Sequence, residues 1–324
     1  RLDRAALRQR PARRIGRRAP VSSSSARSVL ALPDLPWLTL SDSAHDLRLA
    51  QWVDPSQGNV VQRSLSADTG FETILVQPGG QSLGVTTSAL PAGPRNVWDR
   101  GTKLRVRMFS GGLVSKTEAL VRSGANWLAV RNDAAANIWE VLAFRDAELV
   151  APGTYDLTML GRGLRGSPIA GSVDPGALVA VLESLPFAGL EITDLGVPFY
   201  WAGGPSVDIR GAASWTQKQV TPAGAGLKPL APSRLRGELV SGDLVLTWAR
   251  QDRDPRAENL DRASVPMSEE TEQYLITIGA STWSATSETT TILAGELPAT
   301  PFDVTVQQIS AEVGAGHAAT LTVE

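Results

Sequence analysis

The sequence contains no cysteine and only two histidines, His45 and His317. Without thiols the chain has no disulfide, no thiolate metal site and no cysteine nucleophile. Two histidines remove most histidine-based catalysis and most transition-metal sites. No apolar run approaches the roughly 20 residues of a membrane helix, so we predict no transmembrane segment. These absences favour a binding or structural protein, and we expect no enzymatic activity, no metal and no cofactor.

The composition is that of a folded protein with an uneven charge distribution. With 42% hydrophobic and 20% charged residues, the 324-residue chain is not disordered, collagenous or a coiled coil. Residues 1–28 hold nine arginines and one acid, a charge of +8 within a total of −2. No aromatic residue lies among these arginines to stack on a base. We therefore interpret this segment as an arm or linker that docks on an acidic neighbour, and we predict no nucleic-acid contact. Because the chain starts at Arg1, we expect a piece of a longer polypeptide or a processed product.

Strand patterns dominate from residue 71 onward. In residues 103–109, Leu104, Val106 and Met108 alternate with basic residues, which predicts a half-buried strand. Similar patterns occur at residues 125–131, 138–144 and 155–159, separated by glycine and proline. Only residues 115–123 and the first 15 or so have a helical pattern. The fold class predicted is mainly β, with several small sandwich-like or barrel-like β domains.

Composition shifts divide the chain into five parts. A small, polar linker at 221–228 separates a middle region from a C-terminal module of about 95 residues. We assign the remaining boundaries from the strand patterns: 1–28 is the arginine-rich arm, 29–100 a β-rich domain, 101–220 a second β domain and 229–324 the C-terminal module.

The C-terminal module resembles a fibronectin type III domain. Its strand-like segments are short, alternate in polarity and end at turn residues; they lie at 243–248, 273–278, 289–293, 303–309 and 317–323. Trp248 occupies the place of the buried tryptophan of the second strand. Phe302 stands where the family usually has a tyrosine whose hydroxyl bonds to the corner. The resemblance implies a C-terminal fibronectin type III-like sandwich.

Three stretches of the middle region also share a pattern with one family. They are Leu32–Trp37, residues 83–126 and residues 138–166, of which the last is the most specific. It reads W-E-V-x-x-F from Trp139, A-E-L from Ala147, and G-x-Y-x-L-x-x-L-x-R-G-x-x-G from Gly153. This order resembles the C-terminal part of the large tail-tip, or baseplate hub, proteins of siphophages and gene transfer agents.

The resemblance implies a virion structural protein of the tail tip. Such hubs usually assemble as homotrimers, close the distal end of the tail tube and contact other baseplate and distal tail proteins. A host-surface glycan or an outer-membrane receptor is the further partner that the resemblance implies. The expected location is the virion tail, after assembly in the host cytoplasm.

Two motifs that suggest chemistry have simpler interpretations. Gly161–Gly166 reads G-x-G-x-x-G, but Ser167-Pro168 follows where a dinucleotide site needs a helix. We expect a tight turn whose arginines pair with acids or face a partner chain. Asp42, His45 and Asp46 form a polar cluster that we interpret as a capped surface turn rather than a metal site.

Candidate partner-contact residues come from the arm, this turn, an aromatic segment and the long loop 249–271. They are Arg13, Arg14, Arg17, Arg18, Arg162, Arg165, Trp201, Arg250, Arg253 and Arg256. Two alternatives stay open. Trp201, in the run Phe199-Tyr-Trp-Ala-Gly-Gly204, either protrudes on a loop or packs in the core. The loop 249–271 either forms a binding site or packs against a neighbouring domain.

Two other functions remain as alternatives. One is a carbohydrate-binding adhesin or an accessory module of a secreted cell-surface enzyme. The other is a glycoside hydrolase, which needs two carboxylates about 5–10 Å apart across a sugar-sized cleft.

The tail-tip hypothesis predicts different behaviour of two fragments in solution. Because assembly supplies burial that a lone subunit lacks, residues 1–225 should self-associate or be poorly soluble, whereas 226–324 should be a stable monomer. Light scattering on both fragments measures this, and a monomeric, well-folded 1–225 fragment would count strongly against the hypothesis.

Overall fold

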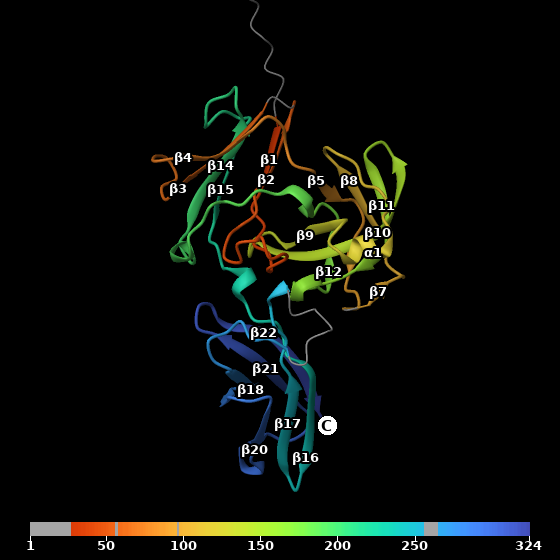
Figure 1. Ribbon diagram of the computed structural model, residues 1–324, viewed down its shortest axis with the longest axis vertical. Coiled ribbons are helices and arrows are strands. Elements are labelled where there is room, and N and C mark those ends of the chain that lie inside the picture. The colour runs from red at the N-terminus through yellow and green to blue at the C-terminus, as the bar shows by residue number, and fades with distance from the viewer. Residues whose placement is uncertain (1–26, 56–57, 96, 256–264) are drawn as a thin grey trace, which may run out of the picture.

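The computed structural model describes residues 27–55, 58–95, 97–255 and 265–324. These residues form three parts (Figure 1). We call residues 27–77 together with 187–220 the first module, residues 83–181 the barrel and residues 233–323 the sandwich. The first module and the barrel lie side by side at one end of the long axis, and the sandwich lies at the other. The prediction of a mainly β chain made of several small β domains is confirmed.

The barrel is closed by six antiparallel strands. Around the ring their order is β10-β9-β13-β5-β8-β11, and β10 pairs with β11 to close it. The two-residue β7 (Trp98–Asp99) pairs with the end of β11, on the same edge of that strand as β8. The six strands are β5 (Leu83–Thr86), β8 (Leu104–Met108), β9 (Trp127–Asp133), β10 (Ile138–Ala151), β11 (Thr154–Gly161) and β13 (Leu178–Val181). Closure gives each of these strands a partner on both sides, which limits the edge that another chain could pair with.

Alternation explains which side chains fill the barrel. On β8 the three apolar residues are buried and Arg105 and Arg107 are exposed, as the period of two predicts. On β11 the alternation breaks at Met159, whose φ is +54°. As a result Leu157 and Leu160, three residues apart, both join the barrel core.

Strand β10 is buried on both faces over its first half, which explains its continuous apolar run. Leu142 and Phe144 point into the barrel core. Trp139 and Val141 instead pack against Leu35 and other apolar side chains of the first module. The outer face of the barrel is therefore the surface on which the first module rests.

The first module is built from two segments that flank the barrel in sequence. Its main sheet has the order β15-β14-β3-β4, and a separate pair joins β1 to β2. These strands are β1 (Arg27–Ala31), β2 (Ala50–Asp54), β3 (Asn59–Ser64), β4 (Glu72–Gln77), β14 (Phe199–Pro205) and β15 (Thr216–Val220). The barrel is thus inserted between β4 and β14. The boundary expected between residues 100 and 101 is wrong, because β5 and β7 lie before it and belong to the barrel.

The remaining elements of this end are short. The α-helix α1 (Glu118–Arg122) begins after the cap Thr117, whose side chain accepts a hydrogen bond from the Leu120 amide, and it confirms the helical pattern at 115–123. The strands β6 (Leu90–Pro91) and β12 (Ser172–Val173) pair with each other. Short 3₁₀ turns lie at Leu164–Gly166, Leu182–Ser184 and Ile192–Asp194. Within the described ranges, no helix is long and apolar enough to cross a membrane.

The sandwich has seven strands in two sheets, with the orders β16-β17-β20 and β19-β18-β21-β22. The strands are β16 (Ser233–Val240), β17 (Asp243–Ala249), β18 (Tyr274–Ile278), β19 (Ser281–Ala285), β20 (Thr289–Ile292), β21 (Phe302–Ser310) and β22 (Gly314–Val323). Trp248 lies in the core and meets Tyr274 edge to face, with ring centroids 5.0 Å apart. All five strand segments expected from the sequence are present, and β16 and β19 are additions to them.

The segment before the sandwich is packed rather than a free linker. The amides of Ala223 and Ala225 donate to the carboxylate of Asp34 at 2.7 and 2.8 Å. Burial raises the pKa of Asp34 even though these bonds favour its charged form. The 3₁₀ turn Ala225–Leu227 is buried except at its first residue. A fragment that begins at residue 229 therefore separates the sandwich more cleanly than one that begins at 226.

Two glycines define the joint between the barrel and the sandwich. A Cβ on Gly166, whose φ is +76°, would lie 2.4 Å from the side chain of Leu230. A Cβ on Gly316, in β22, would lie 2.6 Å from the Pro229 carbonyl oxygen. Because any larger residue would strain the backbone or push the neighbour away, the joint depends on glycine at both positions. The His317 amide, next along β22, donates to the same carbonyl at 3.0 Å.

We predict that acidification weakens this joint through His317. Burial, followed by the charges of Lys228 and Arg95, lowers the pKa of His317 below 6.5. The neutral ring therefore contributes stability above pH 6.5 that is lost as the pH falls through the lowered pKa. Urea unfolding at pH 7, 6 and 5 should show a smaller loss of unfolding free energy for His317→Gln than for the wild type. Equal losses in the two proteins would contradict this role.

Candidate functional site: a groove beside a buried ion pair

The most specific sequence motif forms a buried ion pair at one end of the barrel. Glu140 on β10 shares its strand parity with Leu142 and Phe144, so it points to the barrel interior, and it is fully buried. Arg162, one residue beyond β11, is 1% exposed and binds both carboxylate oxygens of Glu140, at 2.6 and 2.9 Å. Its third nitrogen donates to the Pro91 carbonyl at 2.9 Å. Planar two-point pairing of this kind is what arginine provides and lysine does not.

The turn 162–167 is held in place from several sides. The Gly163 amide donates to Glu140 at 3.1 Å. Arg95 donates to the carbonyls of Gly163 and Ser167 at 2.7 and 2.9 Å. The Ser167 hydroxyl accepts from the amide of Val141 at 2.8 Å. The chain continues as a three-residue 3₁₀ turn, not as an α-helix, so the G-x-G-x-x-G sequence forms no dinucleotide-binding helix start.

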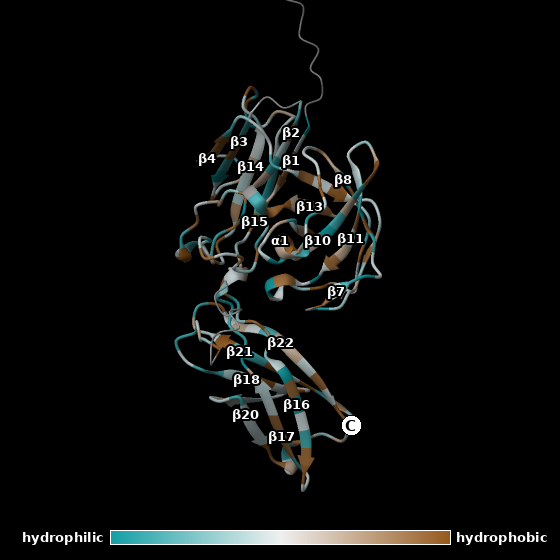
Figure 2. Cartoon of the chain, turned by 45° about the vertical axis from the view of Figure 1, so that its right-hand side comes forward, coloured by the Kyte–Doolittle hydropathy of each residue, from teal (hydrophilic) through white to brown (hydrophobic). Residues whose placement is uncertain are grey.

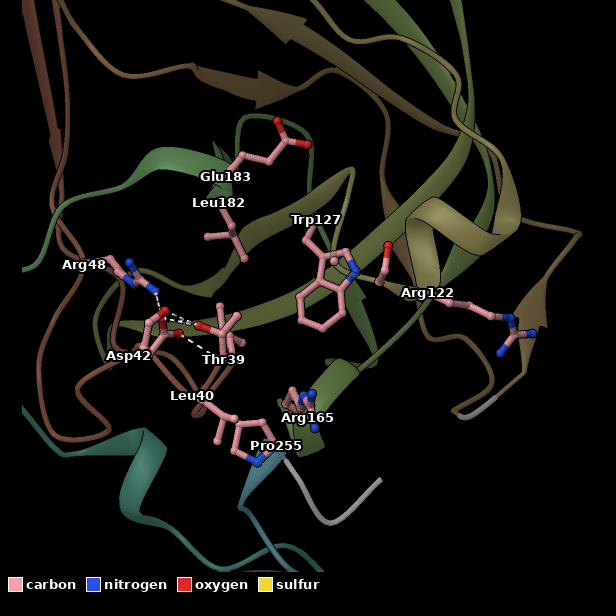
Figure 3. Close-up of a pocket in the computed structure, with 14 residues that line it drawn as sticks. Thr39, Leu40, Asp42, Arg48, Arg122, Trp127, Arg165, Leu182, Glu183 and Pro255 are labelled. Atoms are coloured by element: carbon pink, nitrogen blue, oxygen red, sulfur yellow. Dashed lines mark hydrogen bonds and ion pairs between the residues drawn. The ribbon is translucent and has the colours of Figure 1, made fainter. Parts of the chain in front are cut away.

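Beside this turn lies a groove with two lobes that share Arg122, Trp127 and Arg165. The first lobe, of about 720 Å³, lies between the first module, the barrel and Pro255 of the sandwich (Figure 3). The second, of about 610 Å³, lies on the barrel between α1 and β7. Volumes of this size are typical of small-molecule sites.

The first lobe combines an aromatic wall with a fixed ion pair. The Trp127 indole nitrogen donates to the Val121 carbonyl at 3.0 Å, which holds the ring in place, and Leu182 lies beside it. On the other side Arg48 pairs with Asp42 at 2.7 Å. Asp42 also accepts from the amide and hydroxyl of Thr39, at 3.1 and 2.7 Å. These groups are therefore positioned before any ligand arrives.

The second lobe is basic. Its lining includes four arginines and, within the described part of the chain, no carboxylate; the arginines are Arg100, Arg122, Arg162 and Arg165. Arg162 is neutralised below by Glu140, and Arg122 pairs with Glu118 at 2.7 Å on the surface. The Arg122 guanidinium also lies 5.7 Å from the ring centroid of Trp98. Arg100 is exposed and has no carboxylate within 4.0 Å among the residues described.

The polar cluster of the sequence does not converge on one point. Asp42 caps the turn at Thr39, which confirms the capped-turn interpretation. His45 bonds through Nε2 to the Leu190 carbonyl oxygen at 2.9 Å. Asp46 accepts from the Gly189 amide at 2.9 Å, and burial raises the pKa of its carboxyl. Across the described ranges no group of three or more acids and histidines is arranged to hold a metal.

The arginines predicted as partner contacts have different surroundings. Arg162 pairs with Glu140 and has almost no exposed surface for a partner. Of the two roles expected for the arginines of this turn, Arg162 therefore has that of pairing with an acid. Arg165 lines both lobes of the groove. Arg250 pairs with Glu272 at 3.1 Å and Arg253 with Glu269 at 2.8 Å. Arg13, Arg14, Arg17, Arg18 and Arg256 lie outside the described residues.

Trp201 is a core residue. It lies on β14, is fully buried and meets Phe199 with ring centroids 6.4 Å apart. A Cβ on Gly204 would lie 2.4 Å from the Trp215 ring, so this glycine allows a second tryptophan to cover the strand. The interpretation of a protruding aromatic loop is therefore wrong, and the core interpretation is confirmed.

The residues of the groove other than Arg162 and Arg165 were not predicted from the sequence. They come from several separate segments, and each segment alone looks like ordinary strand or turn sequence. Two signals were available: the high tryptophan count, nine in the chain, and the excess of arginine over lysine. Neither signal specifies which side chains meet.

The barrel of residues 83–181 is also the part of the chain that matches a known family. It is a six-stranded antiparallel barrel with a buried Glu–Arg pair. Residues 81–180 match the family model described as "Rcc01698-like, C-terminal". This family is found in gene transfer agent and phage-like proteins. The match covers a little under a third of the chain and includes residues of all six barrel strands. No curated protein matches the chain.

Breaking the buried ion pair should cost far more than breaking a surface pair on the same strand. Arg162→Ala leaves a buried carboxylate without its partner, so we expect a loss of about 3–5 kcal/mol in unfolding free energy. The double variant Glu140→Leu, Arg162→Met should lose much less than the sum of its two single variants. Chemical denaturation of the wild type, the single variants Glu140→Leu and Arg162→Met, and the double variant gives the coupling energy.

The matched control is Arg145→Ala, which removes a pair with Asp146 at 2.7 Å whose partners are 37% and 39% exposed. Its expected cost is below about 1 kcal/mol. A cost for Arg162→Ala no larger than that of the control would refute the structural role of the pair.

Proposed function

We propose that the chain is a non-enzymatic structural component of a phage or gene-transfer-agent tail tip, a part of the baseplate hub that assembles as a homotrimer in the virion. The observation that carries the proposal is the match of the barrel to a family found in such particles. The two residues that form the buried pair, Glu140 and Arg162, are also motif residues on which the resemblance to hub proteins rests. The seven-strand sandwich, with its three-plus-four sheets, supports the assignment of a type III-like module at the C-terminus.

Exposed aliphatic side chains at both ends of the long axis support assembly. At the first-module end, Val76, Val207 and Ile209 are 66%, 65% and 82% exposed. Val76 lies near the end of β4, where this strand pairs with the start of β3. Val207 and Ile209 lie in the β14–β15 loop. The Ser206 amide of this loop donates to the carbonyl of Gly58, just before β3, which places the loop beside the end of β4. Clusters of this kind mark surfaces that another protein covers.

The opposite end carries a second such cluster. Leu239 and Val240 lie at the end of β16, and Leu293 follows β20; they are 41%, 48% and 59% exposed. The Ala294 amide donates to the carboxylate of Asp243, the first residue of β17, at 2.8 Å, which brings the two segments together. Figure 2 shows the apolar end of β16 at the tip of the sandwich. Clusters at both ends suit subunits that contact neighbours along a tail axis.

The two terminal segments of the chain carry opposite net charges. Residues 229–324 hold 14 acids and six arginines, a net charge of −8, whereas residues 1–28 carry +8. Opposite charge in the two terminal segments favours attraction between unlike parts of neighbouring molecules.

The proposal predicts that the chain is a fixed part of particles. We expect an affinity-tagged chain, produced in the cells that encode it, to co-purify with tailed particles in a constant ratio to their tail-tube protein. Deletion of residues 81–180 should give particles without a complete tail tip in electron micrographs. Recovery of the chain only as a free or cell-surface protein, with normal tails after the deletion, would overturn the proposal and favour the adhesin alternative.

A further inference from the structure

The two-lobed groove has the features of a carbohydrate site with a preference for negative charge, which goes beyond the structural role proposed above. Its aromatic wall is Trp127, whose ring is fixed by the bond to Val121. Trp98 lines the second lobe. The C–H face of a sugar ring is apolar and slightly positive, and it complements the negative face of an indole.

The polar groups of the first lobe suit a ligand rich in hydroxyls. Asp42 and Arg48 offer an acceptor and a donor 2.7 Å apart, and both are held by bonds within the chain. Ser41, Ser123 and Glu183 also line this lobe. Neighbouring hydroxyls of a sugar ring can bridge such a carboxylate–guanidinium pair without moving it, so little ordering is needed on binding.

The second lobe adds the charge preference. Arg100 and Arg122 lie on its lining, and the described residues contribute no carboxylate to that lining. Arg122 already pairs with Glu118 at 2.7 Å, so the exposed Arg100 is the guanidinium left for a ligand carboxylate. A guanidinium pairs with a carboxylate through two parallel hydrogen bonds. A neutral sugar would leave this interaction unused, whereas a sugar acid would satisfy it.

We propose that the groove binds an acidic oligosaccharide, with one sugar ring against Trp127 and a carboxylate-bearing ring beside Arg100 and Arg122. The two lobes, of about 720 and 610 Å³, hold a short chain of sugar rings. An acidic peptide is the other ligand of this charge. The pairing of fixed ring faces with hydroxyl-binding groups favours the saccharide.

The test uses the full chain and tetragalacturonate as the probe, with its fully methyl-esterified form as the neutral counterpart. Calorimetric titration at low salt should show binding of the acid at least about tenfold tighter than binding of the ester. Arg100→Gln should weaken binding of the acid by about fivefold or more and leave binding of the ester unchanged. Arg107→Gln, an exposed arginine on β8 outside the groove, is the matched control and should leave both affinities unchanged.

Two further measurements separate stacking from simple charge attraction. Trp127→Leu should abolish binding of the acid. Because Trp127 also contacts the core between the barrel and the first module, Trp98→Leu is the second variant, and it should weaken binding with an unchanged melting temperature. No binding of the acid, equal binding of acid and ester, equal effects of Arg100→Gln and Arg107→Gln, or tetraglutamate binding as tight as that of the acid would each overturn the proposal.

Discussion

The buried ion pair between Glu140 and Arg162 fixes the turn on which all three parts of the chain meet. A charged pair without exposed surface requires good geometry, and here both carboxylate oxygens and the adjacent Gly163 amide are used. In this turn Arg165 lines the groove. Gly166 lies next to the side chain of Leu230, a residue that precedes the sandwich in the sequence. The same pair therefore supports the end of the barrel, shapes the groove and sets the joint.

The insertion of the barrel into the first module explains why this end behaves as one unit. Strand β10 has apolar residues on both faces because one face fills the barrel and the other supports the first module. If the two parts were separated, the apolar side chains that they bury against each other would be exposed to water. The groove lies at the edge of this contact, where the sandwich also approaches through Pro255. A site formed between parts depends on their relative placement, which the turn and the packed segment 223–227 hold constant.

Local features were predictable from the sequence, and long-range ones were not. The alternation in residues 103–109, the helix near 118 and the strands of the sandwich follow from periods and turn residues that lie within a few positions. The domain boundary at 100 failed because β5, which lies before it, pairs with β8 and β13 beyond it. The second segment of the first module was missed because β3 pairs with β14 across some 140 residues. No local pattern records these pairings. Trp201 stayed ambiguous because its run of aromatic and small residues does not alternate. The groove was missed because its side chains come from segments far apart in the sequence, whereas the Glu140–Arg162 motif was visible but its pairing was not.

The central claim is that the ion pair holds the turn 162–167 as firmly as the barrel strands, and hydrogen–deuterium exchange of the full chain tests it most directly. The Gly163 amide donates to Glu140, and the Ser167 amide donates to the Leu164 carbonyl at 3.0 Å. If the claim is correct, both amides exchange as slowly as those of β9 and β10, because they open only with the barrel. Exchange of these amides at the rate of exposed loops, with slow exchange in β9 and β10, would contradict it.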